Sequence, residues 1–151
     1  MSLILEGTGS VPYFTNVRAT LEALGLHASA YDWYISDIET NYAPPGLTNE
    51  DQWISGEAFE RLITEHEVQF IWGVLSAFPR GVRFVVEHPP AADGNADFWS
   101  GKELVPQLAG AQFEIVSWDS SATILIGLPS EAEERFQTAY PAARHLPSTA
   151  R

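Results

Sequence analysis

Histidine, the side chain that most often binds metals and transfers protons, occurs four times in this sequence, at scattered positions. No two histidines are four residues apart, the spacing that places two imidazoles on one helical face around a metal ion. His66 lies between Glu65 and Glu67, but consecutive helical residues point in different directions and do not converge on one ion. We therefore expect no metal site, and no cofactor is indicated.

A serine nucleophile is a second chemistry that the residue types permit. Asp119, Ser120 and Ser121 follow Trp118, and a predicted strand end at His88 offers the base of a Ser-His-Asp arrangement. The Gly-x-Ser-x-Gly pattern that exposes a nucleophilic serine on a sharp turn is absent. A polar hairpin turn explains the same residues, so no catalytic residue is assigned.

The turn Gly7-Thr8-Gly9-Ser10 stands between an apolar segment and a helical one, where phosphate-binding loops occur. It has neither a third glycine at the fingerprint position nor a Gly-Lys-Ser/Thr sequence. Pro12 removes one N–H donor, and Glu6 repels an anion. We interpret the turn as a helix entry capped by Ser10.

Tryptophan carries a further functional signal. Trp33, Trp72 and Trp118 fall in predicted strands and are expected in the core, whereas Trp53 and Trp99 lie in polar loop or helix-entry surroundings. Tryptophan is a favoured anchor of protein interfaces and sugar-binding faces, because it combines a large apolar body with a polar N–H group. Trp53 and Trp99 are therefore candidate contact residues, with packing at the edge of the core as the alternative.

Acidic residues are concentrated in one stretch of the chain. Between Asp32 and Glu67 there are nine acids and one base, Arg61. Such a segment forms either a solvated, solubilising face or a docking surface for a basic partner. The candidate docking acids are Asp37, Glu39, Glu50, Asp51 and Glu57.

Apolar periodicity predicts the elements of the first half of the chain. Residues 3–5 form a strand, and a helix that ends at Gly25 follows with the apolar stripe Phe14, Val17, Leu21 and Leu24. Residues 31–35 alternate as a strand with one buried face. A second helix begins near Ser55 and Gly56, and its apolar face contains Phe59, Leu62, Ile63 and His66.

The most apolar stretch, residues 69–78, predicts a central strand, and residues 82–87 predict its hairpin partner. Ser100 and Glu103 have the spacing of a capping box, which predicts a short helix ended by Gly110.

The last third of the chain predicts a hairpin and a helix. Residues 113–118 and 122–128 flank a short polar connection and form the hairpin. Ser130 and Glu133 form another capping box, which opens a helix with the apolar face Ala132, Phe136, Ala139 and Ala143.

These elements predict one α+β domain over residues 1–151, with about six mainly antiparallel strands and three or four helices packed on the sheet. We expect residues 1–10 and 146–151 to be loosely ordered ends. The sequence contains no repeat, low-complexity tract or linker long enough to separate two cores.

Composition excludes several classes of protein. The chain has no cysteine, which removes disulfides, zinc–thiolate sites and thiol nucleophiles. No apolar run approaches the ~18 residues of a membrane helix, so no membrane partner is expected. A net charge of −12 disfavours nucleic acid and favours a basic protein as the partner. Because no cleavable apolar leader is recognised, a cytoplasmic location is expected.

Four short signatures follow one another along the chain: Trp33-Tyr34-Ile35-Ser36, Trp53-Ile54-Ser55-Gly56-Glu57-Ala58-Phe59, Ala77-Phe78-Pro79, and Trp118-Asp119-Ser120-Ser121 continuing into Thr123-Ile124. Their order over residues 31–140 resembles a family of small bacterial proteins classed as a domain of unknown function. The resemblance implies no activity, cofactor or site residue. In size, acidity and aromatic content the chain is also similar in character to immunity proteins that neutralise secreted toxins.

These features favour a non-enzymatic cytoplasmic protein that binds a basic protein, such as a toxin domain, through an acidic face containing Trp53 and Trp99. The alternative is a small-molecule or carbohydrate-binding domain with hydrolytic activity, which would use the same tryptophans and strand-end carboxylates such as Glu87 and Asp119. An enzyme needs a concave pocket with converging polar groups, whereas a docking protein needs an exposed patch around a few anchors.

Overall fold

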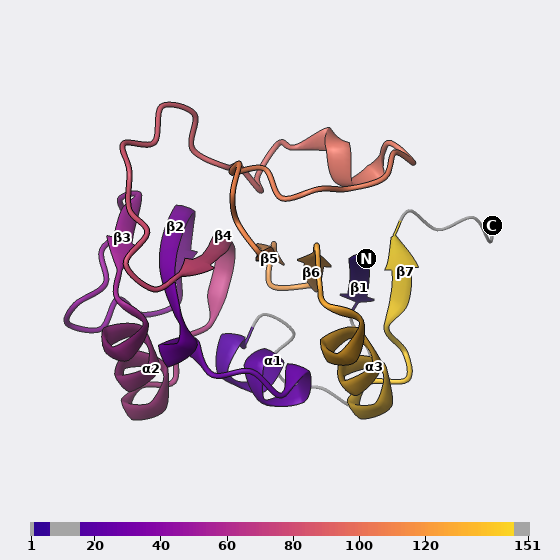
Figure 1. Ribbon diagram of the computed structural model, residues 1–151, viewed down its shortest axis with the longest axis horizontal. Coiled ribbons are helices and arrows are strands. Elements are labelled where there is room, and N and C mark those ends of the chain that lie inside the picture. Colours follow the sequence, from indigo (N-terminus) through magenta and orange to yellow (C-terminus); the bar gives the residue numbers. More distant parts are fainter. Residues whose placement is uncertain (1, 7–15, 147–151) are drawn as a thin grey trace.

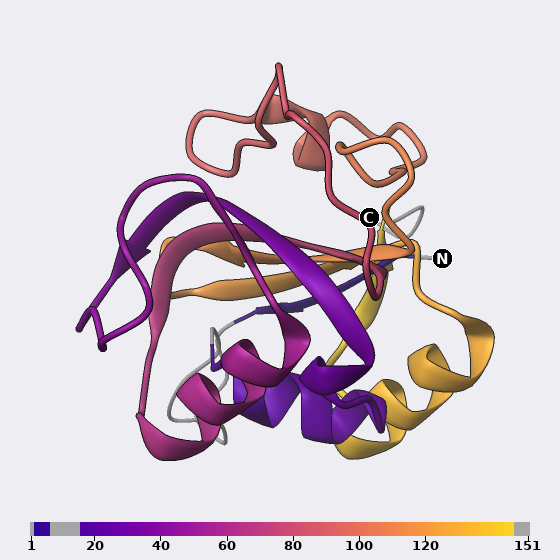
Figure 2. The ribbon, with the colours of Figure 1, turned by 60° about the vertical axis from the view of Figure 1, so that its left-hand side comes forward.

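The computed structural model describes residues 2–6 and 16–146, and these form one sheet between a layer of helices and a long irregular connection (Figure 1, Figure 2). The strands are β1 (Ser2–Glu6), β2 (Tyr31–Thr40), β3 (Gln52–Ile54), β4 (Phe70–Pro79), β5 (Phe113–Trp118), β6 (Ala122–Ile126) and β7 (Arg144–Leu146). Their spatial order is β3-β2-β4-β5-β6-β1-β7, and every neighbouring pair is antiparallel. The α+β class is confirmed, with seven strands in place of about six.

Three α-helices cover one face of the sheet (Figure 2). They are α1 (Val17–Leu24), α2 (Gly56–Glu65) and α3 (Ser130–Ala139), and two short 3-10 helices are η1 (Ala28–Ala30) and η2 (Ala96–Trp99). The main core lies between these helices and the sheet, where Trp33, Phe59 and Phe136 have no exposed surface. Among the described residues, no helix is both long and apolar enough to cross a membrane.

The ends of α1 and α2 follow from local sequence. The side chains of Asn16 and Ser55 accept hydrogen bonds from the backbone N–H of Ala19 and Ala58, which caps the two helices. Gly25 ends α1 with a φ of 72°, a left-handed conformation that glycine adopts without steric cost. Both predicted helices are present, but the expected cap of the first at Ser10 is wrong, because Asn16 caps α1. The predicted turn at residues 7–10 lies outside the described residues.

The start of α3 differs from its prediction. Ser130 is the first helical residue, Pro129 occupies the N-cap position, and no side chain caps this end. The expected capping box is therefore wrong, although the helix is confirmed. Its buried Glu133 instead lies 3.4 Å from the imidazole of His145 in β7, the short polar strand that the sequence did not predict.

The opposite face of the sheet is covered by residues 80–112, which we call the covering loop (Figure 2). The predicted strand over residues 82–87 is wrong, because β4 already pairs with β2 on one side and β5 on the other. The predicted helix from Ser100 to Gly110 is also wrong. Pro106 interrupts it, because proline has no N–H to donate and clashes with the preceding turn of a helix.

Candidate functional site

A row of polar side chains in the middle of the sheet binds the covering loop. Ser36, Ser76 and Glu114 have no exposed surface and lie on the loop-facing side of β2, β4 and β5. The Ser36 hydroxyl donates to the carbonyl oxygen of Pro90 at 2.8 Å, and the Ser76 hydroxyl donates to Glu114 Oε2 at 2.6 Å. The polar side chains on this face of the sheet therefore already have hydrogen-bond partners within the chain.

Glu114 also accepts two backbone hydrogen bonds from the covering loop. The N–H of Gln107 donates to Oε1 at 2.6 Å, and the N–H of Leu108 donates to Oε2 at 3.1 Å. Burial raises the pKa of Glu114, and the hydrogen bonds from Ser76 and the two amides oppose that change. A lone glutamate in the apolar sequence of β5 was the signal for this residue, which the sequence analysis missed.

Asp37 is a second carboxylate, after Glu114, that accepts backbone hydrogen bonds from the covering loop. It lies at a register shift in β2 with a φ of 55°, a left-handed conformation that aspartate tolerates better than most residues. Its Oδ2 accepts hydrogen bonds from the N–H groups of Ala92 and Asp93, both at 2.8 Å. Its own N–H donates to Asp51 Oδ1 at 3.0 Å, so two of the candidate docking acids are joined to each other.

The expectation that residues 31–35 have only one buried face is wrong, because Asp32 is buried as well. The residue is 6% exposed, and its two carboxylate oxygens accept hydrogen bonds from the N–H groups of Gly56 at 3.2 Å and Gly81 at 2.9 Å. Tyr34 is buried on the same face, and burial together with the negative charge of Asp51 raises its pKa. Both faces of β2 are therefore covered: the helices pack on one face, and the covering loop packs on the face that contains Asp32 and Tyr34.

Trp53 lies in β3, not in a loop, and holds the start of the covering loop. Its indole N–H donates to the carbonyl oxygen of Phe84 at 3.0 Å. Its ring packs with the rings of Tyr34, Phe78 and Phe84 at centroid distances of 5.2–5.4 Å. The polar end of this tryptophan is thus already bonded within the chain.

Trp99 is the last residue of η2 and is 42% exposed. Its ring centroid lies 5.1 Å from that of Trp118, which in turn lies 4.9 Å from that of Trp72. Trp72 and Trp118 are half-buried, so their predicted place in the core is only partly correct. The three rings form a contiguous aromatic cluster at the surface of the loop-facing side.

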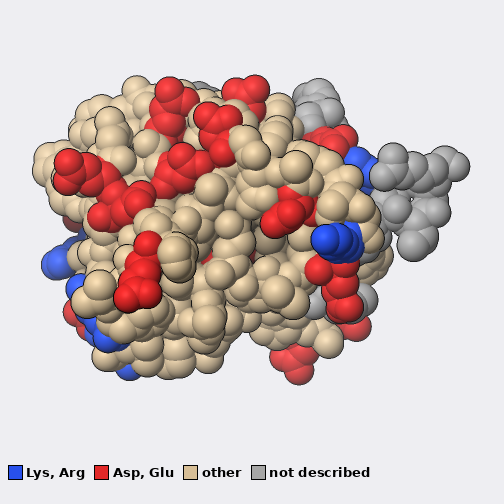
Figure 3. Space-filling view, turned by 90° about the horizontal axis from the view of Figure 1, so that it is seen from above, with Lys and Arg blue, Asp and Glu red and all other residues tan. Residues whose placement is uncertain are grey.

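Two acidic residues are neighbours of this cluster, one across a strand pair and one along the chain. Glu39 lies directly opposite Trp72 in the β2–β4 pairing, so the two side chains share a face, and Asp97 belongs to η2 with Trp99. Both carboxylates are exposed, and neither is in an ion pair with a described Lys or Arg. Figure 3 shows Asp and Glu spread over the loop side of the molecule, with Lys and Arg at its margins.

The other candidate acids occupy different places. Glu50 is exposed beside Asp51 in the connection that precedes β3. Glu57 lies on α2, which covers the other face of the sheet, and its carboxylate pairs with Arg80 at 3.1 Å. The nine acids between Asp32 and Glu67 therefore do not form one continuous face.

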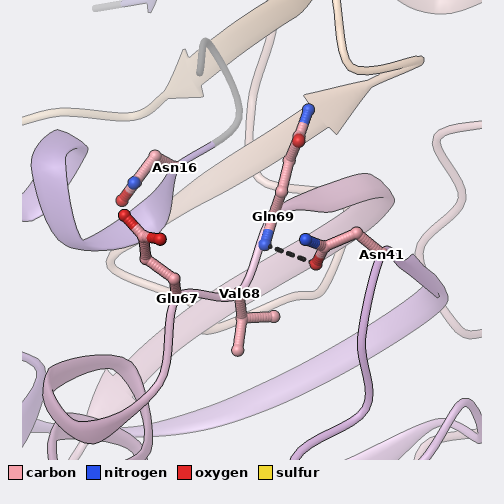
Figure 4. Close-up of a pocket in the computed structure, with 5 residues that line it drawn as sticks. All are labelled: Asn16, Asn41, Glu67, Val68 and Gln69. Carbon is pink, nitrogen blue, oxygen red and sulfur yellow. Dashed lines mark hydrogen bonds between the residues drawn. The ribbon is translucent and has the colours of Figure 1, made fainter. Parts of the chain in front are cut away.

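The hollows of the surface are small or polar. A cavity of about 190 Å³ opens beside the covering loop, with Phe98, Leu104 and Ile126 in its lining. A pocket of about 30 Å³ is lined by Asn16, Asn41, Glu67, Val68 and Gln69, and there the N–H of Gln69 donates to Asn41 Oδ1 at 2.9 Å (Figure 4). Ligand pockets are usually about 300–1,000 Å³ and mostly apolar.

A third hollow of about 450 Å³ lies where α1 begins and α2 ends. Arg18, Glu65 and His66 are among its lining residues, and the imidazole of His66 packs on the ring of Tyr42. Within residues 2–6 and 16–146, no group of three or more His, Asp or Glu side chains is arranged to hold a metal ion.

The predicted hairpin turn after Trp118 is confirmed. Asp119 and Ser120 have φ values of 48° and 56°, and the hydroxyl of Ser121 donates to the carbonyl oxygen of Trp118 at 3.1 Å. These residues form the turn between β5 and β6.

Comparison of the chain with protein-family models, curated proteins and solved structures finds no match, so the resemblance to a domain of unknown function stays a prediction.

Proposed function

We propose that the chain is a protein-binding domain that docks a basic partner on the surface formed by Trp72, Trp99, Trp118, Glu39 and Asp97, which we call the Trp99 face. The observation that carries the proposal is the 42% exposed ring of Trp99, supported from behind by Trp118 and bordered by carboxylates without a described Lys or Arg partner. This arrangement suits lysine or arginine side chains of a partner.

Two physical effects favour such a partner. The face of an indole ring attracts a cation, by about 0.5–1 kcal/mol at an exposed site and more where water is excluded. Tryptophan is also among the residues that contribute most to protein interfaces, particularly when it stands on a packed support. The packing of Trp99 on Trp118 provides that support, because it restricts the ring before a partner binds.

The charge distribution acts over a longer range. The chain carries a net charge of −12, and carboxylates dominate the loop side in Figure 3. Such a field accelerates the association of a basic protein and repels nucleic acid. The charge effect is screened over about 8 Å at physiological ionic strength, so association should slow as salt is added.

The same face also supports docking better than the enclosure of a small ligand. The cavity beside the covering loop has a volume of about 190 Å³, which is below the usual range of ligand pockets. Ser36 and Glu114, the buried polar side chains beneath the covering loop, already bind its backbone. A docking role needs only the exposed ring and its acidic border, and both are available to a partner.

The test is affinity capture from the native host, followed by kinetics with the basic protein recovered. Trp99→Ala should raise the dissociation rate, because it removes the anchor, and Glu39→Lys with Asp97→Lys should lower the association rate. The matched control is Glu65→Lys with Glu134→Lys, which changes the net charge equally at exposed positions on α2 and α3. If neither Trp99→Ala nor the Glu39/Asp97 variant differs from the control pair, the proposal is wrong.

A further inference from the structure

The segment 82–87 has strand propensity but belongs to no strand: residues 82–86 form no regular element, and Glu87 lies in a bend. Phe84 and Val86 face the sheet: the Phe84 ring packs on those of Trp53 and Phe78 at 5.4 and 5.5 Å, and Val86 packs against the same cluster. Val85, between them, is 88% exposed. Val82 and Phe84 are also exposed, so the three residues form an apolar patch of a kind that another chain can cover.

The backbone of this segment is free along one edge. In an extended strand, the N–H and C=O groups of alternate residues point to opposite edges. One edge is occupied at Phe84, whose carbonyl oxygen accepts a hydrogen bond from the indole N–H of Trp53. Within the part of the chain that the structure describes, the backbone groups of Arg83, Val85 and Glu87 form no hydrogen bond.

The sequence of this free edge is complementary to itself. An antiparallel pair of two such segments centred on Val85 places Arg83 of each copy directly opposite Glu87 of the other. Val85 then faces Val85 across the twofold axis, and all three positions are of the hydrogen-bonded type, since these pairs recur every second residue. Arg83 already forms an ion pair with Asp32, in which Nε lies 3.9 Å from Oδ2, but its side chain is about half-exposed and no hydrogen bond fixes it there, so it can reach a partner.

We propose that a second copy of this chain binds along residues 82–87, forming a two-stranded antiparallel ribbon with Arg83–Glu87 pairs at both ends. Gly81 precedes the ribbon, and Pro89 ends it because proline has no N–H to donate. This dimer uses none of the residues of the Trp99 face.

The opposite charges at the ends of the ribbon specify the partner as well as the register. A segment of another protein would need a base and an acid at the same spacing in the reverse direction, whereas a second copy always supplies them. Opposite charges across a strand pair are favourable, and like charges are unfavourable. The net charge of −12 on each copy opposes association, so the dimer should strengthen as salt screens this repulsion.

Sedimentation equilibrium of the purified protein tests the dimer. The wild-type chain should change from monomer to dimer between about 10 µM and about 1 mM, the range of a small interface. Val85→Lys should weaken the dimer about tenfold or more, because it places two cations opposite each other. Val105→Lys is the matched control, since Val105 is 71% exposed elsewhere on the covering loop, and it should dimerise like the wild type.

Charge exchange distinguishes this register from any other contact. Arg83→Glu and Glu87→Arg should each weaken self-association about tenfold. An equimolar mixture of the two variants should associate, because each then faces opposite charges, and the double variant should dimerise like the wild type at the same net charge. A wild-type chain that stays monomeric to about 1 mM contradicts the proposal. So does a dimer that tolerates both single reversals, or a mixture that remains monomeric.

Discussion

The Ser76 hydroxyl donates a hydrogen bond to Glu114 at 2.6 Å in the middle of the sheet, where both side chains are fully buried. No described Lys or Arg pairs with this carboxylate, and its remaining bonds come from the N–H groups of Gln107 and Leu108. A buried carboxylate needs such donors to offset its lost hydration. Because Glu114 binds the N–H groups of Gln107 and Leu108, the covering loop packs as part of the core on this face of the sheet. This packing positions η2 and Trp99.

Replacing Glu114 tests this role. Glu114→Ala removes the acceptor of three hydrogen bonds and leaves the buried Ser76 hydroxyl, the buried Leu108 N–H and the part-buried Gln107 N–H without this partner. We expect a loss of about 2–4 kcal/mol in the free energy of unfolding, measured by urea denaturation. Glu103→Ala, at an exposed position on the same loop, is the control and should change stability by less than about 0.5 kcal/mol. Equal stabilities of the two variants would exclude a structural role for Glu114.

The raised pKa of Glu114 predicts a pH dependence. Burial lifts the folded-state pKa above the value of about 4.3 expected in the unfolded chain, so the folded protein binds this proton more tightly. The resulting stability is fully present below the unfolded pKa and is lost as pH rises through the folded pKa.

Glu114→Gln lacks this titration, and comparison with the wild type isolates it from the other carboxylates. The variant should be less stable by the largest margin below about pH 4, and the margin should shrink as pH rises. Denaturant unfolding at a series of pH values measures the difference. A margin that grows with pH would mean that the hydrogen bonds outweigh burial and that the pKa is lowered.

Asp37 should control local opening of the covering loop. Asp37→Asn keeps a side chain that tolerates the φ of 55° but weakens the bonds to the N–H groups of Ala92 and Asp93. We expect faster hydrogen exchange at these two amides, corresponding to about 1–2 kcal/mol, with unchanged exchange in the Ala19 amide of α1. Unchanged exchange at Ala92 and Asp93 would show that other contacts hold the loop.

Phe136 tests the helical side of the core. Its side chain has no exposed surface and packs among the residues between α3 and the sheet. Phe136→Ala should cost about 3–5 kcal/mol in the free energy of unfolding, because it leaves a large cavity. Thr138→Ala is the exposed comparison on the same helix. A loss under about 1 kcal/mol for the phenylalanine would place its ring outside the core.

The elements that the sequence predicted correctly are those set by local signals. Ser55 caps α2, Gly25 ends α1, and the apolar run of β4 is central in the sheet. The failures have non-local causes. The segment 82–87 has strand propensity, but both edges of β4 are taken by strands distant in sequence. At Ser100, the capping spacing is outweighed by Pro106 downstream.

The candidate site was predicted in its residue types more than in its arrangement. Trp99 could be identified as exposed from its polar surroundings, but its support by Trp72 and Trp118 depends on two strands and a loop meeting. Asp37 was an acid in a charged stretch, and its bonds to Ala92 and Asp93 join residues 55 and 56 positions away. Spacing along the chain carries no information on such contacts.

The indole N–H resonances of the five tryptophans test the proposed docking face most directly. On addition of the basic protein recovered by affinity capture, the signals of Trp99, Trp118 and Trp72 should shift or broaden in a heteronuclear NMR titration. Trp33 is the internal reference, because its ring is fully buried and its N–H donates to the carbonyl of Ala28 at 3.0 Å. Shifts confined to amides of α1, α2 and α3, with the Trp99 signal unchanged, would contradict the account.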